Sequence, residues 1–277
     1  MKRKILYIFF MLLLNFAIYG SEIPRMDRIW KSKNVTFFLS TTRSGSNLVT
    51  ASLSAISRKP IWWLWWTDSI FDHSSECRKH PSYNRLGLPL ISSIPLLYRT
   101  HYEFSLLMRV PSKLNKLIFV TRNPKELLFR EFFLKSTSTV EPDSQFIETF
   151  LKRYLQAFKV YDSWFVENRR LVFYEDFINQ GDEILVQLLQ FMDEEPKYLD
   201  DFITNKQEYM SIMLESYARQ HKRNSGGLSS STDGPKSIYY TKNASLEILT
   251  YIDEYIEKEA PKIWELYLKR FQVVVKP

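Results

Sequence analysis

The segment Phe37-Phe38-Leu39-Ser40-Thr41-Thr42-Arg43-Ser44-Gly45-Ser46-Asn47-Leu48 decides the fold class of this 277-residue chain. An apolar run ends in a hydroxyl-rich turn that holds Arg43 and Gly45, and a helix-forming stretch follows over residues 48–56. A strand, a loop and a helix in this order direct backbone N–H groups and the positive end of the helix dipole at one point, which favours an anion. We therefore predict an anion-binding loop, although an ordinary polar turn would explain this segment taken alone. The candidate donors in the loop are Thr42, Arg43, Ser44 and Ser46.

Similar apolar runs recur along the chain and predict the rest of the sheet. They occupy residues 61–66, 96–100, 117–121 and 171–174 and show little alternation, which is typical of strands buried on both faces of a parallel sheet. Helical patterns lie between or after them at residues 125–135, 144–165 and 182–192, and around Pro261. We predict an α/β fold class, with a central, mainly parallel sheet flanked by helices in three layers.

Composition excludes several classes of protein. The chain is 45% hydrophobic and 25% charged, with 7 Gly and 12 Pro, so it is neither disordered nor collagenous nor a protein with many membrane spans. Its single cysteine, Cys77, excludes an internal disulfide and a multi-cysteine zinc site, and we expect no metal. The net charge of +7 does not predict a nucleic-acid partner, because the aromatic residues follow apolar patterns and do not interleave with a basic stripe.

The N-terminus predicts export. Met1-Lys2-Arg3-Lys4 precedes an apolar run over residues 5–19, and Gly20-Ser21 follows. This pattern is typical of a signal peptide, and the run is shorter than the roughly 20 residues of a spanning helix. We predict a signal peptide or short N-terminal anchor at residues 1–20 and one domain at residues 21–277, located in a periplasmic, lumenal or secreted compartment. Membrane attachment through residues 5–19 and a buried N-terminal helix are the alternatives to cleavage.

Two further segments place basic side chains after apolar runs. The first contains Arg122, which precedes a helix start at Asn123-Pro124, and Arg130 follows two helical turns later. The second is Tyr98-Arg99-Thr100-His101. Open α/β sheets bind ligands at the carboxyl ends of their strands, so Arg122 is a natural phosphate clamp, and the second segment is again a strand that runs into an arginine and a histidine.

Together these segments resemble the sulfotransferase family. Thr41–Asn47 is similar to the family's 5′-phosphosulfate loop, and Val120–Glu126 is similar to its 3′-phosphate motif. Arg99-Thr100-His101 matches the Lys-Thr-His segment that carries the catalytic histidine. Leu171–Phe177 looks like the family's Tyr-Glu-Asp strand and helix. The resemblance covers about residues 35–260 and implies a P-loop-like α/β fold.

The resemblance implies a sulfotransferase that moves a sulfuryl group in line from 3′-phosphoadenosine 5′-phosphosulfate to a hydroxyl or amine acceptor. His101 would be the general base, with Glu76 in reserve, and the catalytic candidates include Arg43 and Arg99. The residues implied to bind the donor are Thr42, Arg43, Ser44, Gly45, Ser46, Asn47, Arg122, Arg130, Tyr174, Lys222 and Arg223.

Departures from the family pattern leave alternatives open. Arg130 stands where the family has serine, so it either grips a phosphate or points to solvent, and Asn47 replaces a threonine. Lys222-Arg223 only loosely echoes the family's C-terminal motif. A non-catalytic nucleotide-binding protein of the same fold remains an alternative. A P-loop kinase is disfavoured, because the chain lacks G-x-x-x-x-G-K-[ST].

The acceptor and the oligomeric state cannot be assigned from the sequence. We expect a small-molecule or glycan acceptor. Four tryptophans lie within residues 62–66, where a core strand is the simplest explanation, and an acceptor side for an apolar or aromatic compound is the alternative.

Overall fold

A computed structural model describes residues 33–59, 61–64, 70–72, 91–92, 94–101, 104–135, 141–209, 211 and 244–273. The predicted signal segment at residues 1–20 lies outside the described residues, as do Glu76, Lys222 and Arg223. Within the described ranges, no helix is both long enough and apolar enough to cross a bilayer.

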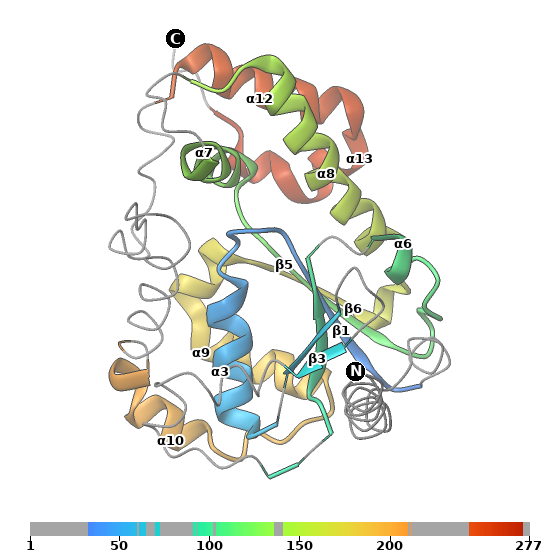
Figure 1. The fold of residues 1–277 in the computed structure, drawn as a ribbon, viewed down its shortest axis with the longest axis vertical. Helices are drawn as coiled ribbons and strands as arrows, with labels where there is room; N and C mark the ends of the chain where they lie inside the picture. The colour runs from blue at the N-terminus through green and yellow to red at the C-terminus, as the bar shows by residue number, and fades with distance from the viewer. Residues whose placement is uncertain are drawn as a thin grey trace, which may run out of the picture.

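A six-stranded sheet forms the centre of the molecule, with strand order β3-β2-β4-β1-β5-β6 (Figure 1). Adjacent strands are parallel, except that β3 pairs antiparallel with β2 at one edge. The predicted mainly parallel sheet is confirmed. The strands are β1 (Thr36–Ser40), β2 (Ile61–Leu64), β3 (Ile70–Asp72), β4 (Leu97–Thr100), β5 (Lys116–Thr121) and β6 (Arg169–Phe173).

Both faces of the sheet are buried, which explains the continuous apolar runs. Phe37 and Leu39 of β1 join one hydrophobic cluster, whereas Phe38 between them joins the other. In β5 the same alternation sends Phe119 to the first cluster and Ile118 to the second. Successive side chains of a strand point to opposite faces, so a strand with helices on both sides buries apolar residues in both directions, as the middle residues of β1 and β5 do.

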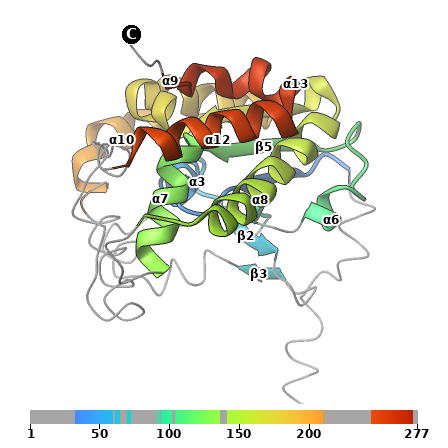
Figure 2. The ribbon, with the colours of Figure 1, turned by 90° about the horizontal axis from the view of Figure 1, so that it is seen from above.

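Helices cover the two faces in separate layers (Figures 1 and 2). One face packs against α3, α9 and α10, and the other against α7, α8 and α12. The predicted three-layer arrangement is therefore confirmed. The helices are α3 (Ser46–Ser57), α6 (Phe104–Leu107), α7 (Pro124–Lys135), α8 (Ser144–Ser163), α9 (Tyr174–Phe191), α10 (Leu199–Thr204), α12 (Leu246–Glu259) and α13 (Pro261–Ile263).

Helix α8 shows how local sequence signals set the element boundaries. The Asp143 carboxylate accepts a hydrogen bond from the Phe146 N–H at 2.7 Å and caps the helix start. Buried aromatic and aliphatic residues then recur on one side of the helix. On that side, the Phe158 ring meets the Phe119 ring of β5 edge to face, with centroids 5.0 Å apart.

Two helical segments differ from the sequence prediction. Helix α9 begins at Tyr174, eight residues before the predicted helix at residues 182–192, and Gln180 within it is non-helical. The break before Gly181 concealed the first part of the helix. After α12 the predicted second C-terminal helix is irregular: α13 continues into a π-helical segment, Trp264–Leu268, and a 3₁₀ segment, Lys269–Phe271.

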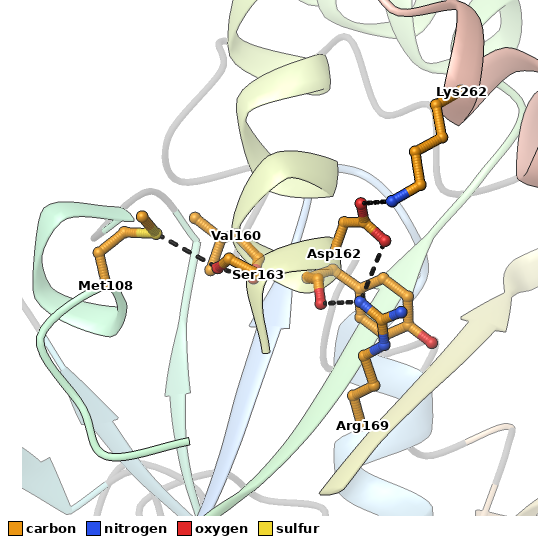
Figure 3. Close-up of polar contacts among 7 residues, drawn as sticks. Met108, Val160, Asp162, Ser163, Arg169 and Lys262 are labelled. Atoms are coloured by element: carbon orange, nitrogen blue, oxygen red, sulfur yellow. Dashed lines mark hydrogen bonds and ion pairs between the residues drawn. The ribbon is translucent and has the colours of Figure 1, made fainter. Parts of the chain in front are cut away.

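Asp162, near the end of α8, joins three parts of the fold (Figure 3). Its carboxylate accepts hydrogen bonds from Lys262 of α13 at 2.6 Å and from Arg169 of β6 at 3.2 Å. The bond from Lys262 and the charges of both cations lower the pKa of the Asp162 carboxyl, although partial burial opposes them. The ionised carboxylate therefore stabilises the folded state.

We predict that Asp162→Asn lowers the melting temperature by roughly 2–4 °C at pH 7. A lowered carboxyl pKa contributes stability above the unfolded value of about 3.9 and loses it as the pH falls through the folded value. Thermal melts of wild type and variant should therefore converge below about pH 4. Glu195→Gln, at an exposed position after α9, is the control and should change little at any pH. Equal melting temperatures at pH 7 would contradict the prediction.

Candidate functional site

The predicted site residues follow the carboxyl ends of four parallel strands. The chain leaves β1 through α3 to β2 on one side of β1, whereas β5 and β6 lie on its other side. This reversal makes the end of β1 the switch point of the sheet, where open α/β sheets bind ligands. The β1–α3 loop, His101 after β4, Arg122 after β5 and Tyr174 after β6 all belong to this edge.

The β1–α3 loop has a strained backbone that its own side chains support. Arg43 and Gly45 have φ angles of 63° and 76°, in the left-handed region. The Ser44 hydroxyl is fully buried and donates to the Thr41 carbonyl at 2.7 Å, so it closes the turn. Gly45 precedes α3 without a side-chain cap, which leaves the N–H groups of the first helical turn without a partner inside the helix. This helix start suits an anion.

The Tyr174 ring packs directly on the backbone of Gly45. A Cβ atom added to Gly45 would lie 2.1 Å from Cδ2 of Tyr174, a distance that no side chain tolerates. The Arg122 guanidinium carbon lies 4.5 Å from the centroid of the same ring, in a cation–π contact. Three separate segments of the sequence therefore meet around one aromatic ring.

Two arginines lie together in this buried region. Nε of Arg122 is 3.6 Å from Glu175, and Nε of Arg130 is 3.7 Å from Glu126, so both ion pairs exceed normal hydrogen-bond lengths. Burial, followed by the nearby charge of Arg130, lowers the pKa of Arg122, while Glu175 and Glu126 act in the opposite direction. The Arg130 side chain is only 13% exposed, so of the two alternatives it faces inward beside Arg122. Two adjacent guanidinium groups suit a phosphate.

Residues distant in sequence hold Arg122 and the start of α7. The Tyr154 hydroxyl donates to the Arg122 carbonyl at 2.9 Å, and burial raises the pKa of Tyr154, which keeps this donor protonated. The Asn123 N–H donates to Glu175 at 3.1 Å. Lys125 forms a buried ion pair with Asp253 of α12. No local pattern in the sequence links α8 or α12 to the arginine motif, so these partners could not be predicted from it.

His101 is oriented by Ser40. Its Nδ1 atom lies 2.8 Å from the Ser40 hydroxyl oxygen and 3.2 Å from the Ser40 carbonyl oxygen. Because a carbonyl only accepts hydrogen bonds, the contact favours the tautomer with a proton on Nδ1. In that tautomer Nε2 carries the lone pair, as a general base requires. Ser40 belongs to no motif that predicts this role.

Arg99 is buried against the first turns of α3. Its guanidinium donates to the Ser46 hydroxyl at 2.6 Å and to the Thr50 hydroxyl at 3.2 Å, both on α3. Ser46 and Thr50 are also linked directly, through a 2.8 Å bond to the Ser46 carbonyl. This geometry favours a role in positioning α3, and the predicted catalytic role of Arg99 remains a prediction.

The other loop residues point in different directions. The Thr42 hydroxyl donates to buried Glu131 of α7 at 3.1 Å, and Glu131 also receives Arg153 at 2.8 Å. Arg43 is half-buried, and Asn47 is exposed. The hydroxyl of Thr42, like those of Ser44 and Ser46, therefore bonds to other parts of the protein, and the donor-binding roles of these residues remain predictions.

Among the described side chains, no group of three or more His, Cys, Asp or Glu could hold a metal ion.

The fold is that of the sulfotransferases. Mouse sulfotransferase SULT7A1 complexed with PAP matches with a TM-score of 0.52 and 18% sequence identity, over 87% of this chain and 89% of that chain. Retinol dehydratase in complex with androsterone and inactive cofactor PAP matches with a TM-score of 0.51 and 14% identity, over 83% and 81%. No protein-family model matches the sequence, and no curated protein does. At these identities the likeness shows the fold alone.

We predict that Gly45→Ala destabilises the protein by about 2 kcal/mol or more, since the left-handed backbone and the Tyr174 ring both oppose a Cβ atom. Gly181→Ala in α9 is the matched control: the nearest atom to its Cβ would be 3.8 Å away, and alanine favours a helix by about 0.5–1 kcal/mol. Thermal or urea unfolding compares the two. Equal stability changes would show that Tyr174 does not require a glycine at position 45.

Proposed function

We propose that this chain is a sulfotransferase that uses 3′-phosphoadenosine 5′-phosphosulfate. The observation that carries the proposal is the meeting of Arg122, Arg130, Tyr174 and Gly45 at the carboxyl edge of a sulfotransferase fold. Two solved structures of this fold are complexes with PAP. The His101–Ser40 pair at the end of the adjacent β4 strand adds a candidate base to the same edge.

The residues fit a nucleotide that carries phosphate at both ends. Arg122 and Arg130 would hold the 3′-phosphate, with Tyr174 between them and the loop. Backbone N–H groups at the start of α3 and the half-buried Arg43 would bind the 5′ group. Hydrogen bonds to charged groups contribute about 1.5–3 kcal/mol each, so several of them support micromolar binding after the cost of association. The Gly45 backbone allows close approach, since it carries no side chain.

The same geometry supports the proposed catalytic roles. The donor supplies the activated sulfuryl group when it is bound. His101 would take the proton of the acceptor hydroxyl or amine on Nε2, while Ser40 holds Nδ1. Arg43 would stabilise negative charge on the leaving side, a task that needs a positioned cation rather than a proton. Arg99 would fix α3, which presents the loop.

A non-catalytic nucleotide-binding protein is the main competing function. It predicts donor binding without turnover, so binding and transfer must be measured separately. We propose a small-molecule or glycan acceptor. Donor labelled in the sulfuryl group is incubated with a panel of alcohols, phenols, amines and sugars to test for transfer. If the nucleotide binds but no compound receives the label, the non-catalytic function is favoured.

We predict that Arg122→Ala weakens binding of adenosine 3′,5′-bisphosphate by roughly 10- to 100-fold, because it removes a charge-assisted contact worth about 1.5–3 kcal/mol. Isothermal titration calorimetry measures the affinity. Arg170→Ala is the matched control, since this exposed arginine lies at the start of β6, away from the site, and should bind normally. Unchanged affinity in Arg122→Ala would remove Arg122 from the proposed site.

We predict that His101→Ala lowers sulfuryl transfer by about 10²–10⁴-fold while the affinity for adenosine 3′,5′-bisphosphate stays near normal. A positioned base affects proton removal from the acceptor and not the nucleotide contacts, so turnover and calorimetry should separate. If the variant retains wild-type turnover, another group is the base. A parallel loss of nucleotide affinity would instead indicate a structural role for His101.

A further inference from the structure

Exposed apolar side chains gather at the amino edge of the sheet. Met108, Leu114, Phe165 and Val166 are between 38% and 59% exposed. Single exposed apolar residues are ordinary on a protein surface, whereas several on adjacent turns mark an interaction site. We call these four side chains the amino-edge patch.

Two turns that contact each other carry the patch. One turn precedes β5 and the other precedes β6. The Ser163 hydroxyl donates to the Met108 sulfur at 3.4 Å, as Figure 3 shows. The Asn168 amide donates to the carbonyls of Ser112 and Lys113 at 3.1 Å and 3.0 Å. These bonds hold the two turns together, so the patch is one surface.

Cations border the patch. Arg109 and Lys113 are exposed within the same turn, and the Lys113 ammonium lies 5.8 Å from the centre of the Phe165 ring. Exposed Lys33 and Arg170 belong to the same edge. The exposed carboxylates there are Glu167 and Asp193, and Asp193 is paired with Lys116. Apolar side chains surrounded by net positive charge favour an apolar layer with an anionic surface.

The chain enters the fold beside the patch. The Asn34 N–H donates to the Leu114 carbonyl at 2.8 Å. The apolar run at residues 5–19 precedes this point in the sequence, and the 14 residues between the run and Asn34 can extend at most about 50 Å. A bilayer that holds the run would therefore be within reach of the patch. The nucleotide site lies at the opposite, carboxyl edge of the sheet and stays accessible when the amino edge is covered.

We propose that the amino-edge patch docks the domain on the surface of a bilayer that contains anionic lipid. Met108, Phe165 and Val166 would enter the interfacial layer, with Arg109 and Lys113 on the headgroups. Charge argues against residues 1–19 of the chain itself as the occupant, because Lys2, Arg3 and Lys4 repeat the sign of the patch. The proposal is independent of the proposed enzymatic activity.

A polarity-sensitive fluorophore tests the proposal in the full chain. The label is attached to Val166→Cys in a Cys77→Ser background, and the matched control carries it at Leu246→Cys. Leu246 is also exposed, but it lies at the start of α12, near Glu141 and the amino end of α8. The patch adjoins the carboxyl end of α8, and a helix of 20 residues is about 30 Å long. Vesicles of phosphatidylcholine with and without phosphatidylserine are added to each protein.

We expect the emission of the label at position 166 to shift to the blue with phosphatidylserine vesicles and to shift less with phosphatidylcholine alone, while the label at position 246 does not respond. Adding Arg109→Glu and Lys113→Glu should abolish the preference for phosphatidylserine. An unresponsive label at position 166 on a protein that sediments with vesicles would overturn the proposal, because residues 5–19 alone would then explain binding. Blue-shifted emission without vesicles would also overturn the proposal, because protein would then cover the patch. A shift that depends on protein concentration would indicate a second copy of the chain, and one that does not would indicate the chain's own N-terminal segment.

Discussion

The contact between the Tyr174 ring and the Gly45 backbone is the constraint on which the rest of the site depends. It joins the loop after β1 to the first residue of the helix after β6, although five strands and four α-helices of the described chain lie between them in sequence order. The same ring also contacts Arg122, whose guanidinium carbon lies 4.5 Å from the ring centroid. A side chain at position 45 would displace the ring and with it the support of the arginine. The glycine is needed for two reasons at once, its positive φ angle and the closeness of the ring.

Buried charge is the second organising feature. Arg122, Arg130 and Lys125 lie within a few residues of one another, and burial lowers the pKa of both Arg122 and Lys125. Each cation is balanced by a carboxylate from the same or another element, namely Glu175, Glu126 and Asp253. Removing one member of a buried ion pair usually costs more than the pair contributes, since the remaining charge stays buried. The looser ion pairs lie at the proposed nucleotide site, whereas Lys125 and Asp253 hold α12 against α7.

Local sequence signals predicted much of this architecture. Asn123-Pro124 predicts the start of α7, and Asp143 predicts the start of α8, because both signals act through hydrogen bonds to the next few N–H groups. Apolar runs predict the strands of a sheet that is covered on both faces, because consecutive residues of such a strand are buried on alternate faces. The start of α9 was not predicted, because Gln180 interrupts the helical pattern. Packing on both sides of this break stabilises the helix.

By itself the sequence determined the α/β class. It also predicted the loop with its one glycine and the four segments that bear the candidate site residues, because these depend on spacing along the chain. Only the tertiary structure decided that Arg130 faces inward, that Ser40 holds the ring of His101 and that Arg99 lies beneath α3. Those outcomes depend on contacts between residues far apart in the sequence: 61 positions separate Ser40 from His101, and 53 separate Ser46 from Arg99. The order of the strands sets such meetings, and no local pattern of residues records them.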